Sequence, residues 1–93
     1  MSFRVTEINF DPSRRDEYLV FADSQREKIQ AVNGIQSVDV IEVAEGQSVI
    51  IARYDSEESA VAATETIQGI LGGMAEFMTS PPNRRGGPIM WEL

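Results

Sequence analysis

The sequence contains a run of four consecutive apolar residues, Val49 to Ala52, within a segment rich in β-branched side chains. Successive residues of a strand point to opposite faces of a sheet, so an apolar run of this kind indicates burial on both faces. The segment predicts a strand over 48–54. A chain of 93 residues provides one domain, 1–93, whose helices can cover only one face of such a sheet.

Three further strands are predicted, over 3–10, 36–44 and 88–93. In the first, Phe3 and Val5 share one phase while Ile8 and Phe10 share the other, which indicates either a bulge near Thr6-Glu7 or burial on both faces. The second strand shows the same slip, and Ala44–Gln47 then has the length of a hairpin turn.

The closing segment Ile89–Leu93 alternates between apolar and other residues, with Ile89, Trp91 and Leu93 on one face. We expect that face to be buried against the helices or against a partner. The preceding Ser, Pro, Asn, Arg and Gly residues, from Thr79 to Pro88, predict a loop.

Two helices are predicted, near 12–32 and 56–72. Asp11-Pro12 is typical of a helix start, and Asn33-Gly34 of a helix end. Asp55 and Glu58 resemble a capping box at the second helix. Glycines near its end predict a break at Gly72-Gly73, because each weakens a helix by roughly 1 kcal/mol relative to Ala.

The element order is β-α-β, turn, β-α-β. With right-handed crossovers this order gives an α+β, ferredoxin-like fold: a four-stranded antiparallel sheet of order 4-1-3-2 with two helices on one face. A two-layer α+β sandwich with another strand order is the alternative.

Composition excludes several chemistries. The chain has no Cys and no His, which removes thiolate nucleophiles, imidazole bases and the usual zinc and haem ligands. We expect no metal and no cofactor. A net charge of −7 disfavours nucleic acid and anionic membranes as partners. Apolar runs are far shorter than a membrane span, so a cytoplasmic protein is expected.

Several stretches resemble the dimeric α+β-barrel superfamily, which includes antibiotic-biosynthesis-type monooxygenases and stress-responsive barrel proteins. They are Gly34-Ile35, the hairpin, Tyr54-Asp55-Ser56-Glu57-Glu58 and Ile89-Met90-Trp91-Glu92. The resemblance spans nearly the whole chain. Many monooxygenase-like members carry a His in the second helix, where this chain reads Ala60-Val61-Ala62-Ala63-Thr64, which argues against a His-dependent mechanism.

Candidate site residues fall into three groups. Glu7 and Glu42 interrupt apolar strands, and a buried strand carboxylate can act as a base, although solvated acids are the favoured interpretation. Arg84-Arg85-Gly86-Gly87 can grip an anion, although a solvated loop is favoured. The resemblance implies a ligand pocket between sheet and helices, for which plain core packing is the alternative; its candidates are Tyr18, Phe21, Tyr54, Met74, Phe77 and Trp91.

Two functions follow from the resemblance. The first is a small-molecule-binding or stress-related dimer without assigned catalysis, and the second is a cofactor-free monooxygenase or isomerase acting on a small aromatic or polyketide-like substrate. The sequence leaves open whether the protein is an enzyme. Apolar residues in both phases of the strands predict a homodimer joined through its sheet faces, with a possible small apolar ligand.

Overall fold

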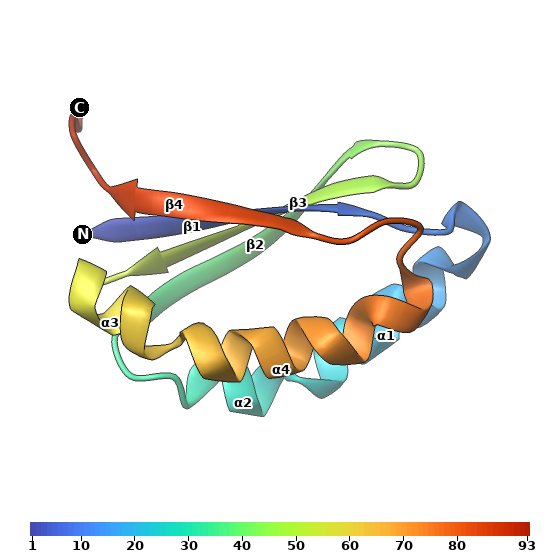
Figure 1. The fold of residues 1–93 in the computed structure, drawn as a ribbon, viewed down its shortest axis with the longest axis horizontal. Helices are drawn as coiled ribbons and strands as arrows, with labels where there is room; N and C mark the ends of the chain where they lie inside the picture. Colours follow the sequence, from blue (N-terminus) through green and yellow to red (C-terminus); the bar gives the residue numbers. More distant parts are fainter.

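One four-stranded antiparallel sheet carries all the helices on a single face in the computed structural model, which describes residues 1–93 (Figure 1). The strand order β2-β3-β1-β4 is the predicted order read from the other edge, so the ferredoxin-like α+β fold is confirmed. The strands are β1 (Ser2–Asn9), β2 (Ile35–Ala44), β3 (Gln47–Tyr54) and β4 (Asn83–Pro88).

Each predicted helix is divided into shorter segments. The first comprises η1 (Pro12–Arg14), α1 (Arg15–Ser24) and α2 (Arg26–Gln30), and the second comprises α3 (Glu57–Ala62), α4 (Thr64–Met74) and η2 (Ala75–Phe77). The start predicted at Asp11-Pro12 is confirmed, since the Asp11 carboxylate accepts from the Ser13 amide at 3.0 Å. Gly34 follows the first helix with a φ of 84°, a conformation that favours glycine.

Two details of the second helix differ from prediction. The N-cap is Ser56, whose Oγ accepts from the Ser59 amide at 3.1 Å, and the Asp55 amide donates to the Gly34 carbonyl. The break falls at Ala63, and α4 runs through Gly72 and beyond. The apolar stripe of α4 buries three large side chains against the sheet, which offsets the low helix propensity of its glycines.

The predicted last strand is wrong in position. β4 is Asn83–Pro88, the segment expected to be a loop, and Ile89–Leu93 is a tail outside the sheet. β4 is an edge strand that pairs only with β1, and an edge tolerates the Gly and Pro that a central strand does not. Figure 1 shows the tail leaving the end of β4 on the side away from the helices.

The tail does not pack on the helices as expected. Trp91 is 74% exposed, and Met90 and Leu93 are fully exposed or nearly so. One ion pair ties the tail to the sheet, between Arg53 Nη2 and Glu92 Oε2 at 3.5 Å. The tail therefore presents large apolar side chains to whatever lies beyond the uncovered face.

Side chains along β1 alternate between the two faces of the sheet, and the strand has no bulge. β1 pairs with β3 in continuous register from Ser2 to Asn9, so the bulge proposed near Thr6-Glu7 is absent and both faces carry apolar residues. The face turned away from the helices is called the open face below. Its apolar residues are Phe3, Val5, Ile41, Val49 and Ile51.

The helix side of the sheet holds the core. One cluster joins the ends of β1, α1 and α4 through Ile8, Phe10, Tyr18, Ile70, Leu71, Met74 and Phe77, and a smaller one lies under α3 around Tyr54 and Ala60. None of the helices combines the length and the apolar character that crossing a bilayer requires.

Candidate functional site

A cavity of about 70 Å³ lies between the sheet and the helices. Eleven of its fourteen lining residues are hydrophobic. The lining comprises Arg4 and Thr6 of β1, Ala22 and Ile29 of the first helix, Val38 and Val40 of β2, Ile50, Ala52 and Tyr54 of β3, Ile67, Ile70, Leu71 and Met74 of α4, and Arg84 of β4.

The periodicity of each element explains this lining. The even-numbered residues of β1 and β3 face the helices, because side chains alternate along a strand. In α4 the contributing residues stand at positions i, i+3, i+4 and i+7, which form one helix face. Small side chains at Ala22 and Ala52 leave the space that larger residues would fill.

Two polar groups in the cavity wall have no hydrogen-bond partner. Tyr54 is 0% exposed, and its hydroxyl is buried and unpaired. Arg84 is half-buried, and its Nη2 is also sheltered from solvent and unpaired. Leaving buried donors unpaired costs free energy, so a partner that enters the cavity and accepts from them is favoured.

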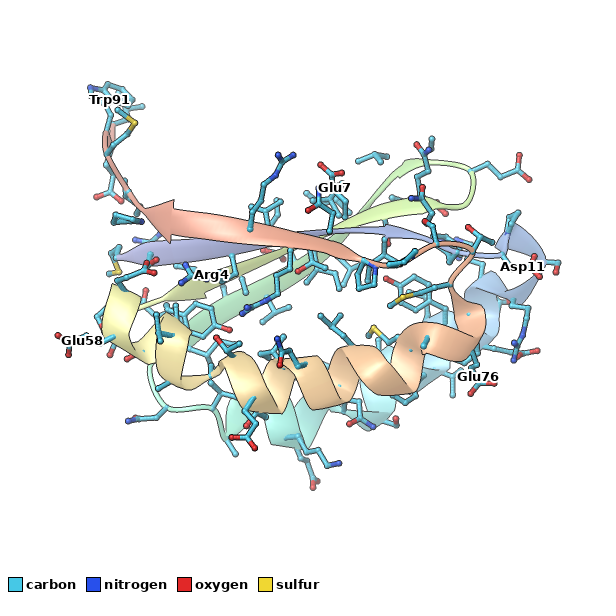
Figure 2. The ribbon with its side chains drawn as sticks, viewed as in Figure 1. Arg4, Glu7, Asp11, Glu58, Glu76 and Trp91 are labelled. Atoms are coloured by element: carbon cyan, nitrogen blue, oxygen red, sulfur yellow. The ribbon has the colours of Figure 1, made fainter.

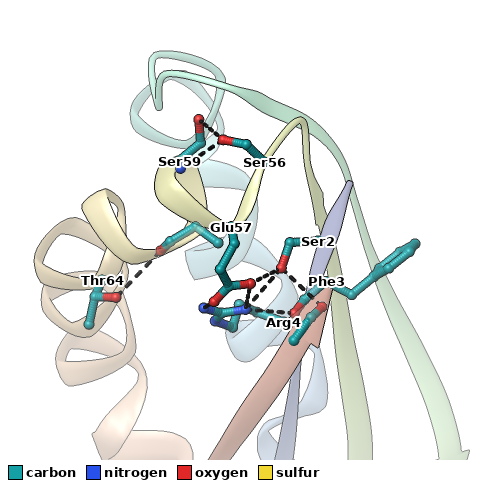
Figure 3. Close-up of polar contacts among 9 residues, drawn as sticks. Ser2, Phe3, Arg4, Ser56, Glu57, Ser59 and Thr64 are labelled. Carbon is teal, nitrogen blue, oxygen red and sulfur yellow. Dashed lines mark hydrogen bonds and ion pairs between the residues drawn. The ribbon is translucent and has the colours of Figure 1, made fainter. Parts of the chain in front are cut away.

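The other arginine of the wall, Arg4, already has a partner. Its guanidinium forms a double contact with Glu57, with Nη2 to Oε1 at 2.5 Å and Nη1 to Oε2 at 3.2 Å, and Ser2 donates to the same carboxylate (Figure 3). The hydrogen bond from Arg4, with a further one from Ser2, lowers the pKa of Glu57 to about 2. The hydrogen bond with Glu57 likewise raises the pKa of Arg4, so both groups stay charged at neutral pH.

The Arg4–Glu57 arrangement depends on a glycine in the neighbouring strand. Gly86 lies opposite Arg4 in the β1–β4 register. A Cβ at Gly86 would lie 2.8 Å from Arg4 Cδ and 2.0 Å from the carbonyl oxygen of Phe3. A side chain there would therefore displace both the strand and the guanidinium.

An open groove of about 490 Å³ lies beside the cavity, between the first helix and the edge strand β2. Ala22, Ile29, Val38 and Val40 line both spaces, so the groove leads to the cavity wall from outside. Val40 is 41% exposed, because the helices do not extend over β2. The edge beside β2 is thus the side from which a ligand can approach.

The predicted pocket residues separate into three places. Tyr54 and Met74 line the cavity. Tyr18 and Phe77 belong to the core, where the Tyr18 hydroxyl bonds Ser48 Oγ at 2.9 Å and burial raises the pKa of Tyr18. Phe21 packs on that cluster, and Trp91 lies on the tail far from the helices (Figure 2).

The two candidate carboxylates lie outside the cavity. Glu7 projects from the side of the sheet opposite the helices and pairs with Arg85 at 3.0 Å (Figure 2). Glu42 pairs with Arg15 at 2.7 Å at the edge of β2, and the hydrogen bond from Arg15 lowers its pKa. Both are solvated ion pairs, the interpretation that the sequence favoured. No group of acidic residues comes together in a way that would hold a metal ion.

From the sequence, Arg84 and Arg85 were interpreted as one basic pair in a loop, so the separate orientation of Arg84 was not predicted. Adjacent strand residues point to opposite faces, so Arg84 joins the cavity while Arg85 joins the open face. The signal that would have separated them is a strand assignment for 83–88, and the composition of that segment opposed it.

Comparison with solved structures finds the predicted ferredoxin-like fold in other proteins. The chain matches Rv0793 from Mycobacterium tuberculosis with a TM-score of 0.77, at 19% identity over 98% of this chain and 96% of that one. It matches the ActVA-Orf6 monooxygenase of Streptomyces coelicolor, solved with the ligand nanaomycin D, with a TM-score of 0.76, at 18% identity over 99% and 90%.

A third match is a dimeric ferredoxin-like protein from an uncultured marine organism, with a TM-score of 0.76, 14% identity and coverage of 99% and 90%. No protein-family model matches the sequence, and no curated protein is significantly similar to it. At these identities the comparisons show only that the chain shares the fold of these proteins.

Proposed function

We propose that the protein is a homodimer that binds a small, largely apolar molecule in the cavity of each protomer. The observation that carries this proposal is the cavity itself, which lies between a sheet and helices and is lined mainly by aliphatic side chains. Pockets of this kind, with a few polar groups among apolar ones, are the usual form of small-molecule sites.

The volume of the cavity limits the ligand. About 70 Å³ is below the usual range for drug-sized molecules, so a ring-sized ligand requires the wall to yield. Met74 is a flexible side chain in that wall, and α4 contains three glycines that lower its intrinsic stability. Both features favour a cavity that opens when a ligand enters.

The open face supports the dimer. Its apolar residues, of which Ile41 is exposed and the others half-buried, form with the exposed tail carrying Trp91 a surface that a monomer rarely leaves to solvent. A two-fold partner covers it with the same residues. The dimeric ferredoxin-like structure noted above has the same fold, which supports the same assembly here.

Binding without assigned catalysis is the function that the cavity supports. None of its lining residues is a carboxylate, so it offers no general base of the kind that Glu7 or Glu42 would supply. The alternative of a cofactor-free oxygenase or isomerase receives no support from that wall. A cytoplasmic location stays a prediction.

Native mass spectrometry of protein purified from cells tests both parts of the proposal. We expect twice the protomer mass, with an additional small mass that is lost on denaturation. Ala52→Leu fills the cavity and should remove the added mass, whereas the matched control Ala62→Leu, at an exposed position of α3, should retain it. A folded wild-type protein that is monomeric, or that carries no small molecule and binds none, contradicts the proposal.

A further inference from the structure

Arginine pairing in this chain has one exception. Six of the seven arginines lie within 4.0 Å of a carboxylate oxygen: Arg4, Arg14, Arg15, Arg26, Arg53 and Arg85. Arg84 forms no ion pair and no side-chain hydrogen bond, although acidic residues outnumber basic ones by 15 to 8. The unpaired arginine is also the one that lines the cavity beside Arg4, whose charge is already matched.

Strand geometry keeps the acids of the sheet away from Arg84. It lies opposite Thr6 in the β1–β4 register, on the helix side, while its neighbour Arg85 turns to the open face and pairs with Glu7. Arg4 has Glu57 at its guanidinium, and the pKa of about 2 keeps that carboxylate ionised and committed to Arg4. One positive charge in the wall thus remains without a counter-ion.

Tyr54 adds a second donor to the same cavity. Its side chain is fully buried, and its hydroxyl has no partner in the protein. A guanidinium and a phenol O–H are both donors to an oxygen anion, and the surrounding aliphatic groups strengthen such hydrogen bonds by excluding water. Neither donor is explained by core packing, which would favour apolar side chains at both positions.

We infer that the ligand is a small organic anion, an apolar ring or short chain with one carboxylate, and that Arg84 and the Tyr54 hydroxyl bind the carboxylate. Arg84 supplies the charge and a forked pair of donors that match the two carboxylate oxygens. The apolar body of the ligand lies against Ile50, Ile67 and Leu71. This inference rests on the proposed function, and it specifies the chemical class of the ligand.

Matched acids and amides provide the test. Wild-type protein is titrated with benzoate and benzamide, and with 2-naphthoate and 2-naphthamide, and binding is followed by calorimetry or ligand-detected NMR. We expect the acid of at least one pair to bind about tenfold or more tightly than its amide, since hydrogen bonds to a charged group are the strong ones. Arg84→Gln should abolish this preference, and Arg85→Gln, on the same strand but the other face, should keep it.

Tyr54→Phe supplies a second variant that leaves the charge in place. Because the hydroxyl has no partner within the protein, its removal should leave the fold intact and weaken acid binding alone. Equal binding of acids and amides overturns the anion inference and leaves the proposed cavity function standing. An acid preference that survives both Arg84→Gln and Tyr54→Phe overturns the inference alone. Binding of no member of either pair, by protein that also carries no small molecule in native mass spectrometry, overturns both the inference and the proposed function.

Discussion

The strongest test of the dimer compares two neighbouring residues of β3. Ile50 lines the cavity on the helix side, and Ile51 lies on the open face opposite Val5. The same change at each, Ile50→Glu and Ile51→Glu, places an identical charge on opposite sides of one strand. We expect Ile51→Glu to give a folded monomer and Ile50→Glu to destabilise the protomer itself.

The magnitude follows from the symmetry of the interface. Full burial of an isoleucine contributes roughly 1.5–3 kcal/mol. Ile51 is already partly covered within the protomer, so the lower value applies, and a two-fold interface contains it twice. The loss is therefore about 3 kcal/mol, which raises the dimer Kd by about 100-fold before the cost of burying two carboxylates is added. Ile50→Glu should cost the protomer about 2–5 kcal/mol.

Sedimentation equilibrium at low micromolar concentration measures the mass, and urea unfolding measures the stability of each variant. Wild-type protein that is a folded monomer at this concentration would refute the argument. A dimer that withstands Ile51→Glu with an unchanged Kd would show that the open face is not the interface.

Three further predictions concern single positions. Glu57→Gln should lose stability above pH 4.5 and flatten the pH dependence between about 4.5 and 2, because the wild-type carboxylate has a lowered pKa, stabilises the fold when ionised and loses that contribution as pH falls; urea midpoints across pH 2–6 test this. Trp91→Ala, made in the monomeric Ile51→Glu background, should change unfolding by less than about 1 kcal/mol, since the ring is exposed there. Gly72→Ala should stabilise the protein by about 1 kcal/mol in thermal unfolding, because its Cβ meets no atom within 4 Å, whereas Gly73→Ala, 2.5 Å from Phe21 Cζ, should gain less or nothing.

The sequence predicted those parts of the fold that local chemistry determines. Asp11-Pro12, Gly34 and the hairpin at Gly46 each match a residue type to a backbone conformation, and their positions were predicted correctly. The apolar run of β3 also identified a sheet with two apolar faces. From these elements the strand order follows by the handedness of the connections.

Tertiary pairing determines the parts that the sequence misplaced. Asn83–Pro88 has low strand propensity and becomes β4 only because β1 offers an unpaired edge beside it. The alternating Ile89–Leu93 segment has the pattern of a strand but meets no strand within its own protomer. Of the candidate pocket residues, Tyr54 and Met74 line the cavity, while the position of Arg84 was missed because its orientation depends on the register of β4.

The edge strand β2 has a consequence for how the chain behaves at high concentration. Its outer backbone groups face no other strand, and Val38, Val40, Ile41 and Val43 are all substantially exposed. A segment of this composition can add to the same edge of another molecule and start a fibril. Irregular pairing at both ends of β2, together with the acidic Asp39 and Glu42 between the valines, interrupts such growth. Both features disfavour pairing of β2 with the same edge of another molecule.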